Sequence, residues 1–168
     1  MPILDVDGLK FDFDADWSPS KCDEWGFYRN QWSRMWNGIK SVDLIAVAPD
    51  KTAWLIEVKD YRQHARTKTI DLAAEVAHKT FDTLAAMLPA KLSANDDGES
   101  AMAGSVLAAK KLRVVLHLEQ PKKHSALRPR AINPADVQQD LKRLITPIDA
   151  HPFVAESSRM GSLGWKVT

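Results

Sequence analysis

The sequence predicts an α/β fold in which a central mixed β-sheet is covered by helices on both faces. Three observations lead to this prediction. The chain has 168 residues, the size of one domain. Hydrophobic residues make up 45% and charged residues 27%, as in ordinary globular proteins. Segments with the two-residue period of strands are interleaved with helical segments, an order typical of α/β proteins.

We expect residues 1–168 to form one domain. Its parts are an N-terminal hairpin at 1–16, a core at about 20–120 and a C-terminal helix and strand extension at 133–168. The hairpin is predicted because apolar and acidic residues alternate around Asp7-Gly8, a pair that favours a tight turn.

The next segment is predicted to form a helix over residues 22–36, because aromatic residues recur there at helical spacing. These residues are Trp25, Tyr28, Trp32 and Trp36. We interpret them as core packing, with a base-stacking surface as the alternative. Two strands, 42–48 and 53–59, follow with a short linker, so we expect an antiparallel hairpin.

The second half of the chain continues this alternation. The predicted elements are a helix at 70–88 closed by Pro89, a helix at 100–109, a strand at 112–118, a helix from Asn133 to about Ile145 and one or two short strands in the tail. Asn at a cap position followed by Pro is a typical helix start. The strand at 112–118 is reached through a helical crossover.

The single cysteine, Cys22, excludes an internal disulfide and a cysteine metal cluster. A reducing, cytoplasmic location is therefore expected. The apolar runs are too short for a membrane span, and the acidic N-terminus is unlike a signal peptide.

The charge is unevenly distributed although the net charge is only +1. Residues 1–58 carry six Lys+Arg against ten Asp+Glu, and residues 110–130 carry seven basic residues and one acid. This distribution suggests a carboxylate-lined site beside a phosphate-binding surface. Solvated charge on loops is the alternative.

Three charged residues fall on the two strands of the predicted hairpin. Asp43 begins the first strand, while Glu57 and Lys59 lie two residues apart on the second and therefore face the same side. A charge inside an apolar strand costs stability unless it is paired or holds a cation. Converging carboxylates suit Mg²⁺ or Mn²⁺, and the adjacent acids keep Lys59 protonated. A buried Glu–Lys ion pair that holds the sheet is the alternative.

This pattern of Asp43, a 13-residue gap and Glu57-Val-Lys59 resembles the core signature of the PD-(D/E)XK nuclease superfamily. The surrounding residues are similar to those of Holliday-junction resolvases and small restriction-like endonucleases. The resemblance implies a restriction-endonuclease-like fold and a metal-dependent nuclease that hydrolyses phosphodiester bonds in DNA. It covers about residues 20–90, with the strand at 112–118 as the next core strand.

The resemblance also implies the role of each residue. Asp43 and Glu57 would ligate Mg²⁺ or Mn²⁺, and the Val58 carbonyl would add a ligand. The metal would lower the pKa of bound water, and Lys59 would position or activate that water. Many members add an acid from the preceding helix, a place that Glu24 matches.

Some assignments leave alternatives open. Asp23 is an acceptable substitute for Glu24. The helix after Lys59 often contributes a polar residue to such sites, for which His78 and Lys79 are candidates, with ordinary surface positions as the alternative.

Basic and aromatic residues downstream of the motif are expected to contact nucleic-acid phosphates rather than read bases. They are Tyr61, Arg62, His64, Arg66, Lys68, Lys122, Lys123, Arg128 and Arg130. DNA is thus the expected partner, with a homodimer as a further partner and no membrane. The alternatives are a catalytically silent nuclease-fold module that binds nucleic acid or serves in assembly, and an unrelated α/β domain.

Overall fold

A computed structural model describes residues 2–122 and 131–168 of the chain. The strands are β1 (Ile3–Val6), β2 (Leu9–Phe13), β3 (Ser18–Lys21), β4 (Leu44–Val47), β5 (Thr52–Asp60), β6 (Lys111–Glu119), β7 (Phe153–Ala155) and β8 (Trp165–Val167). The helices are η1 (Cys22–Glu24), α1 (Gly26–Asn30), η2 (Trp32–Arg34), α2 (Leu72–Ser93), α3 (Asp97–Leu107) and α4 (Pro134–Ile145). In the described ranges, no helix is long and apolar enough to cross a membrane.

The central sheet is mixed, as predicted, with the strand order β3-β4-β5-β6-β7. β3, β4 and β5 are antiparallel neighbours, and β6 pairs in parallel with both β5 and β7. The β5–β6 pairing runs over all nine residues of each strand and places Glu57 beside Leu116 and Lys59 beside Leu118. The crossover between these two strands contains α2 and α3. The α/β class is therefore confirmed.

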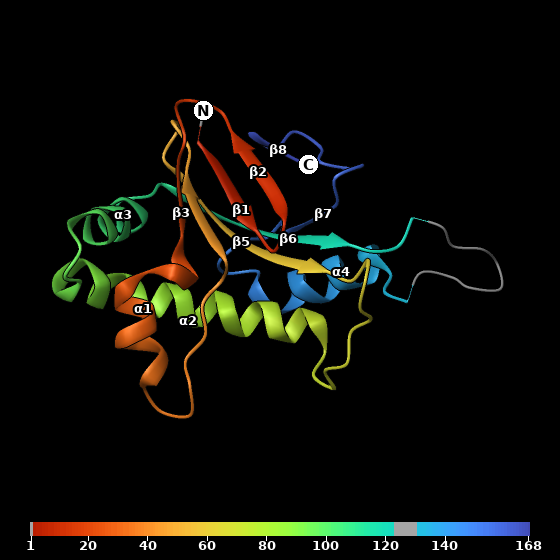
Figure 1. Cartoon of the computed structure of the whole chain (residues 1–168), viewed down its shortest axis with the longest axis horizontal. Coiled ribbons are helices and arrows are strands. Elements are labelled where there is room, and N and C mark those ends of the chain that lie inside the picture. The colour runs from red at the N-terminus through yellow and green to blue at the C-terminus, as the bar shows by residue number, and fades with distance from the viewer. Residues whose placement is uncertain (1, 123–130) are drawn as a thin grey trace.

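The prediction of helices on both faces is wrong. In Figure 1, α2 and α4 lie below the central sheet, and the small antiparallel sheet β1-β2-β8 lies above it. Alternate apolar residues of the small sheet, Phe11, Phe13 and Trp165, pack in one core cluster with Leu44 and Ile56 of the central sheet. These strands are short and come from opposite ends of the chain, so their local patterns do not reveal that they form one layer.

The helix predicted over residues 22–36 is broken into η1, α1 and η2. Trp25 leaves the helical conformation with a ψ of 136°, and the Glu99 carboxylate accepts hydrogen bonds from the backbone N–H groups of Gly26 and Phe27. The Glu99 side chain, 73 positions along the chain, thus binds the first amides of α1. The expected core stripe is correspondingly incomplete, because Trp25 is buried while Trp36 is 90% exposed.

Helix α2 continues through Pro89, where the sequence predicted its end. Proline removes one backbone hydrogen bond from a helix. Met87 and Ala90 on either side of it are buried against α3 and the sheet, so tertiary packing holds this turn in place. Helix α4 begins as predicted, with the Asn133 side chain accepting from the Ala135 N–H.

Candidate functional site

The three motif residues lie on the face of the central sheet that α2 covers. Asp43 directly precedes β4, and Glu57 and Lys59 lie two residues apart on β5. The Asp43 carboxylate accepts a hydrogen bond of 2.7 Å from the Val58 N–H. Asp43 therefore joins β4 to β5, and Val58 takes part through its amide.

Glu57 is completely buried, and two lysines compensate its charge. Its Oε1 lies 2.8 Å from Nζ of Lys59 and 2.6 Å from Nζ of Lys79, which comes from α2. Its Oε2 has no hydrogen-bond partner within the described ranges. Burial, and then the neighbouring charge of Asp43, raise the pKa of Glu57 to about 7 despite the two lysines.

A second carboxylate, Glu75 of α2, gathers three more cationic contacts. Its oxygens lie 3.0 Å from Nζ of Lys59, 2.6 Å from Nζ of Lys68 and 2.7 Å from a guanidinium nitrogen of Arg66. Burial alone would raise the pKa of Glu75, but hydrogen bonds from these three cations hold it at about 2. Burial opposes the charge of Lys59 as well, and Glu57 and Glu75 together raise its pKa above the usual value.

We call these residues the closed charge cluster: Asp43, Glu57, Lys59, Arg66, Lys68, Glu75 and Lys79. Four of these residues, Asp43, Lys68, Glu75 and Lys79, line a cavity of about 550 Å³ together with further acidic and basic side chains. Asp23 is one of them, and burial, followed by the charge of Asp43, raises its pKa to about 6. The cluster thus contains a network of ion pairs centred on Glu57 and Glu75, whereas Asp43 is held by the Val58 amide and contributes an acidic charge beside it.

The donor set of the cluster gives the predicted Mg²⁺ or Mn²⁺ no support. Lys59 and Lys79 both contact Oε1 of Glu57, and their ammonium groups repel a divalent cation, while Oε2 has no partner in the described residues. In the part of the chain that the structure describes, no group of three or more His, Cys, Asp or Glu side chains is arranged to hold a metal. Metal binding stays an untested prediction.

Of the residues left as alternatives for this site, Asp23 and Lys79 lie at it, whereas Glu24 does not. Glu24 is 46% exposed at its side chain and pairs on the surface with Lys21, whereas Asp23 lines the cavity. Lys79 contacts Glu57 directly, and exposed His78 lines the same cavity.

The residues predicted to contact phosphates are engaged in different ways. Arg66 and Lys68 both pair with Glu75, although the Lys68 side chain stays 58% exposed. Arg66 also donates to the Tyr61 hydroxyl. Arg62 is exposed and forms a forked ion pair with Asp60. His64 and Lys122 are exposed. The remaining candidates, Lys123, Arg128 and Arg130, lie outside the described residues.

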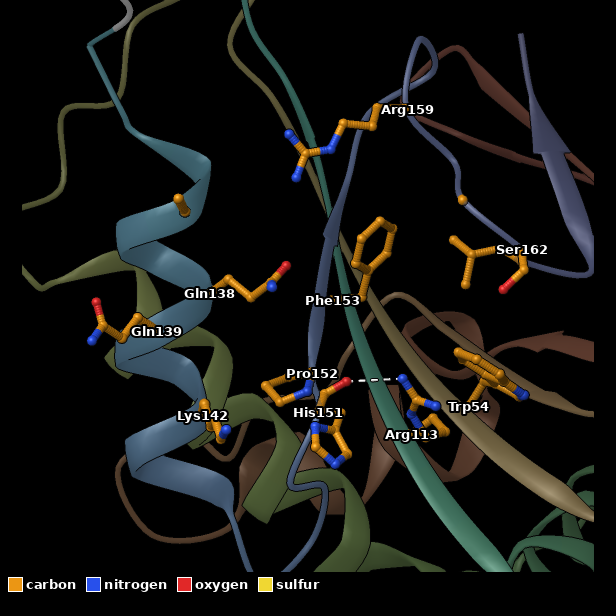
Figure 2. Close-up of a pocket in the computed structure, with 13 residues that line it drawn as sticks. Trp54, Arg113, Gln138, Gln139, Lys142, His151, Pro152, Phe153, Arg159 and Ser162 are labelled. Atoms are coloured by element: carbon orange, nitrogen blue, oxygen red, sulfur yellow. Dashed lines mark hydrogen bonds between the residues drawn. The ribbon is translucent and has the colours of Figure 1, made fainter.

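A second site, which the sequence did not predict, lies beside β7, the edge strand of the central sheet. We call it the basic cleft, a cavity of about 590 Å³ between α4, β7 and residues 159–163. In Figure 2, Gln138 and Lys142 project from α4 on one side of this space, and Phe153 of β7 and Arg159 border the other.

Arg113 forms part of the wall of the basic cleft and is held in place. Its guanidinium lies 5.1 Å from the centre of the Trp54 ring, pairs with buried Asp149 at 3.2 Å and donates to the His151 carbonyl at 2.8 Å. Figure 2 marks this last bond. Arg113 fell in the basic stretch 110–130, but nothing in the local sequence connects it with Lys142 or Arg159.

Comparison with known proteins gives one informative similarity. The chain is 30% identical to a cysteine--tRNA ligase of Neisseria meningitidis (serogroup A / serotype 4A) over a stretch that covers 81% of this chain and 24% of the ligase. The chain thus spans about a quarter of the length of that relative. No family model matches the sequence, and no solved structure matches it.

These findings contradict the predicted membership of the PD-(D/E)XK superfamily, because neither a family model nor a solved nuclease structure matches and the similar protein is a tRNA ligase. The predicted function as a DNA nuclease, and with it the description as a hydrolase, is wrong on the same finding. The catalytic roles predicted for Asp43, Glu57, Lys59 and Glu24 rested on that resemblance alone.

Proposed function

We propose that this chain is an RNA-binding module that acts on tRNA together with an aminoacyl-tRNA ligase. The observation that carries the proposal is the similarity to a cysteine--tRNA ligase along 81% of the chain. Because the match covers a quarter of that enzyme, the proposed role is binding beside the ligase reaction rather than the reaction itself. A cytoplasmic location is part of the same proposal.

The contacts of Glu57 and Glu75 support a structural role for these two carboxylates. A group that acts as an acid, base or metal ligand needs a face open to the reacting atoms. Glu57 is completely buried, and Glu75 contacts three cations. These ion pairs join α2 to β5, which supports the alternative of a buried ion pair that holds the sheet.

The basic cleft supports an anionic partner. Lys142 and Arg159 are exposed and form no ion pair within the described ranges, so their charge is directed to solvent. Cations of this kind bind nucleic acids through phosphate oxygens and release counterions from them. RNA takes the place of the DNA partner that we predicted from the sequence.

The proposal is tested by titrating the full chain into fluorescently labelled cysteine tRNA and into a DNA duplex with as many nucleotides, and by following anisotropy. We expect tRNA to bind about tenfold more tightly than the duplex, and binding of both to weaken steeply between about 50 and 200 mM salt. The control protein is Lys10→Ala, which removes an exposed cation from β2. Failure to bind tRNA at low salt, or equal affinity for the duplex, contradicts the proposal.

A further inference from the structure

The basic cleft has the size and shape of a site for a small ligand. Its volume of about 590 Å³ lies within the range of about 300 to 1,000 Å³ found for ligand pockets. Its walls come from four separate parts of the chain: β5, β6, α4 and the segment from residue 151 to 163. A site with walls from several packed elements is pre-formed, so a ligand does not have to order it.

The charge of the basic cleft selects an anion. Arg159 and Lys142 lie towards the two ends of the cleft, with Gln138 and Phe153 between them (Figure 2). Arg113 lies in its wall and is bonded to the His151 carbonyl. No Asp or Glu belongs to its lining within the described ranges. The nearby carboxylate of Asp149 is buried and bound to Arg113, so it compensates that one arginine and leaves the other two cations available.

The remaining walls suit a flat ring. Phe153 is half-buried and lies along the cleft opposite Gln138 (Figure 2). The Gln138 side chain is fixed, because its Oε1 accepts a 3.0 Å hydrogen bond from the Val154 N–H. Its NH₂ group is thereby held in a defined orientation as a donor. An aromatic face next to a fixed amide is the combination with which proteins hold an unpaired base.

We infer that the basic cleft binds one unpaired nucleotide, with its base against Phe153 and the Gln138 amide and its phosphate attracted by the two flanking cations, Lys142 and Arg159. This inference deepens the proposed function and rests on it, since it names the part of an RNA that this module would hold. Arg113 forms the floor of the site and positions Trp54, whose ring it covers.

The inference is tested by calorimetric titration of the full chain with AMP and, separately, with ribose 5-phosphate. We expect AMP to bind, and ribose 5-phosphate to bind about tenfold more weakly because it has no base to stack. Arg159→Ala and Lys142→Ala should each weaken both ligands about tenfold, since each removes one of the two exposed cations that attract the phosphate. Both residues are exposed, so these variants keep the fold.

A third variant, Phe153→Leu, should weaken AMP about tenfold and leave ribose 5-phosphate unchanged. The matched control is Arg34→Ala, an exposed arginine on η2 away from the cleft lining, which should leave both affinities unchanged. Circular dichroism checks that Phe153→Leu is folded. Equal binding of AMP and ribose 5-phosphate, or full binding by Arg159→Ala and Lys142→Ala together, overturns the inference.

The two proposals fail in different ways. If the chain binds tRNA but not AMP, the cleft inference is overturned and the RNA-binding module stands. If the chain binds AMP through the cleft but no tRNA, the proposed function is overturned and the nucleotide site stands.

Discussion

The closed charge cluster and the basic cleft use the same side chains in opposite ways. In the cluster, Nζ of Lys59 and Lys79 lie within 3.0 Å of carboxylate oxygens, and Glu57 between them is completely buried. In the cleft, Lys142 and Arg159 are exposed and have no carboxylate partner within the described ranges. Buried charges must be paired, whereas exposed ones can wait for a ligand. The comparison separates charges that hold the fold from charges that serve binding.

The largest effect is expected for Glu57→Ala. Removing this carboxylate leaves Lys79 without its partner and opens a gap under α2, which should lower the free energy of unfolding by about 3 kcal/mol. The measurement is urea unfolding at pH 8, followed by circular dichroism. A variant as stable as the wild type would show that the cluster does not hold the fold.

The pH dependence of the cluster comes second. The folded-state pKa of Glu75, about 2, lies below the ordinary value of 4.5, so this residue stabilises the fold above about pH 4.5. That contribution, about 2 kcal/mol after screening by its partly exposed partners, should be lost as the pH falls towards 2. Urea unfolding across this range should show the loss in the wild type and a flatter profile in Glu75→Gln.

Glu57 should act in the opposite direction over a different range. Its pKa of about 7 lies above the ordinary 4.5, so the folded state binds more protons and stability falls as the pH rises from about 4.5 to 7. Asp23, with a pKa of about 6, adds to this slope. Glu57→Gln should reduce the slope without removing it, whereas an unchanged slope would assign it to other groups.

The cleft should respond in binding and not in stability. The double variant Lys142→Ala/Arg159→Ala should weaken tRNA binding at least about tenfold and reduce the slope of log affinity against log salt by about two. Its free energy of unfolding in urea should stay within about 0.5 kcal/mol of the wild type, because both side chains are exposed. A large loss of stability would show that Lys142 and Arg159 help to hold the fold, as the cluster residues do.

The smallest effect is expected for Glu24→Ala. Its pairs with Lys21 and Arg29 are exposed, so the free energy of unfolding should change by less than about 0.5 kcal/mol. Compared with Glu57→Ala by the same urea unfolding, this variant isolates the effect of burial, because both remove a glutamate with two cationic neighbours. Equal losses would contradict our explanation of the cluster.

The sequence was most informative where a local pattern determines the structure. Strand periodicity placed Glu57 and Lys59 on one face, and the Asn133-Pro134 pair marked the start of α4. It was least informative where distant residues decide. Glu99 divides the helix expected at 22–36 by binding the Gly26 and Phe27 amides. Nothing in the sequence around either segment indicates that the two are in contact.

The two sites differ in the same respect. Asp43, Glu57 and Lys59 lie on two adjacent strands, so their proximity could be predicted, but the partners that neutralise them come from α2. The basic cleft draws its walls from residues as far apart as 54 and 163, which only the packing of α4 and β7 against the sheet brings together. The electrostatic state of a site depends on such partners, and a short motif does not contain them.

The small sheet over the upper face has a consequence for how the chain is made. β2 pairs on one side with β1, a few residues earlier, but on the other side with β8, where Phe11 meets Val167. During synthesis on the ribosome, that second edge of β2 must wait for more than 150 further residues. An open strand edge with apolar neighbours invites association with other nascent chains. Because β8 joins β2 last, we expect the small sheet to form late in folding or to need a chaperone that covers the open edge of β2.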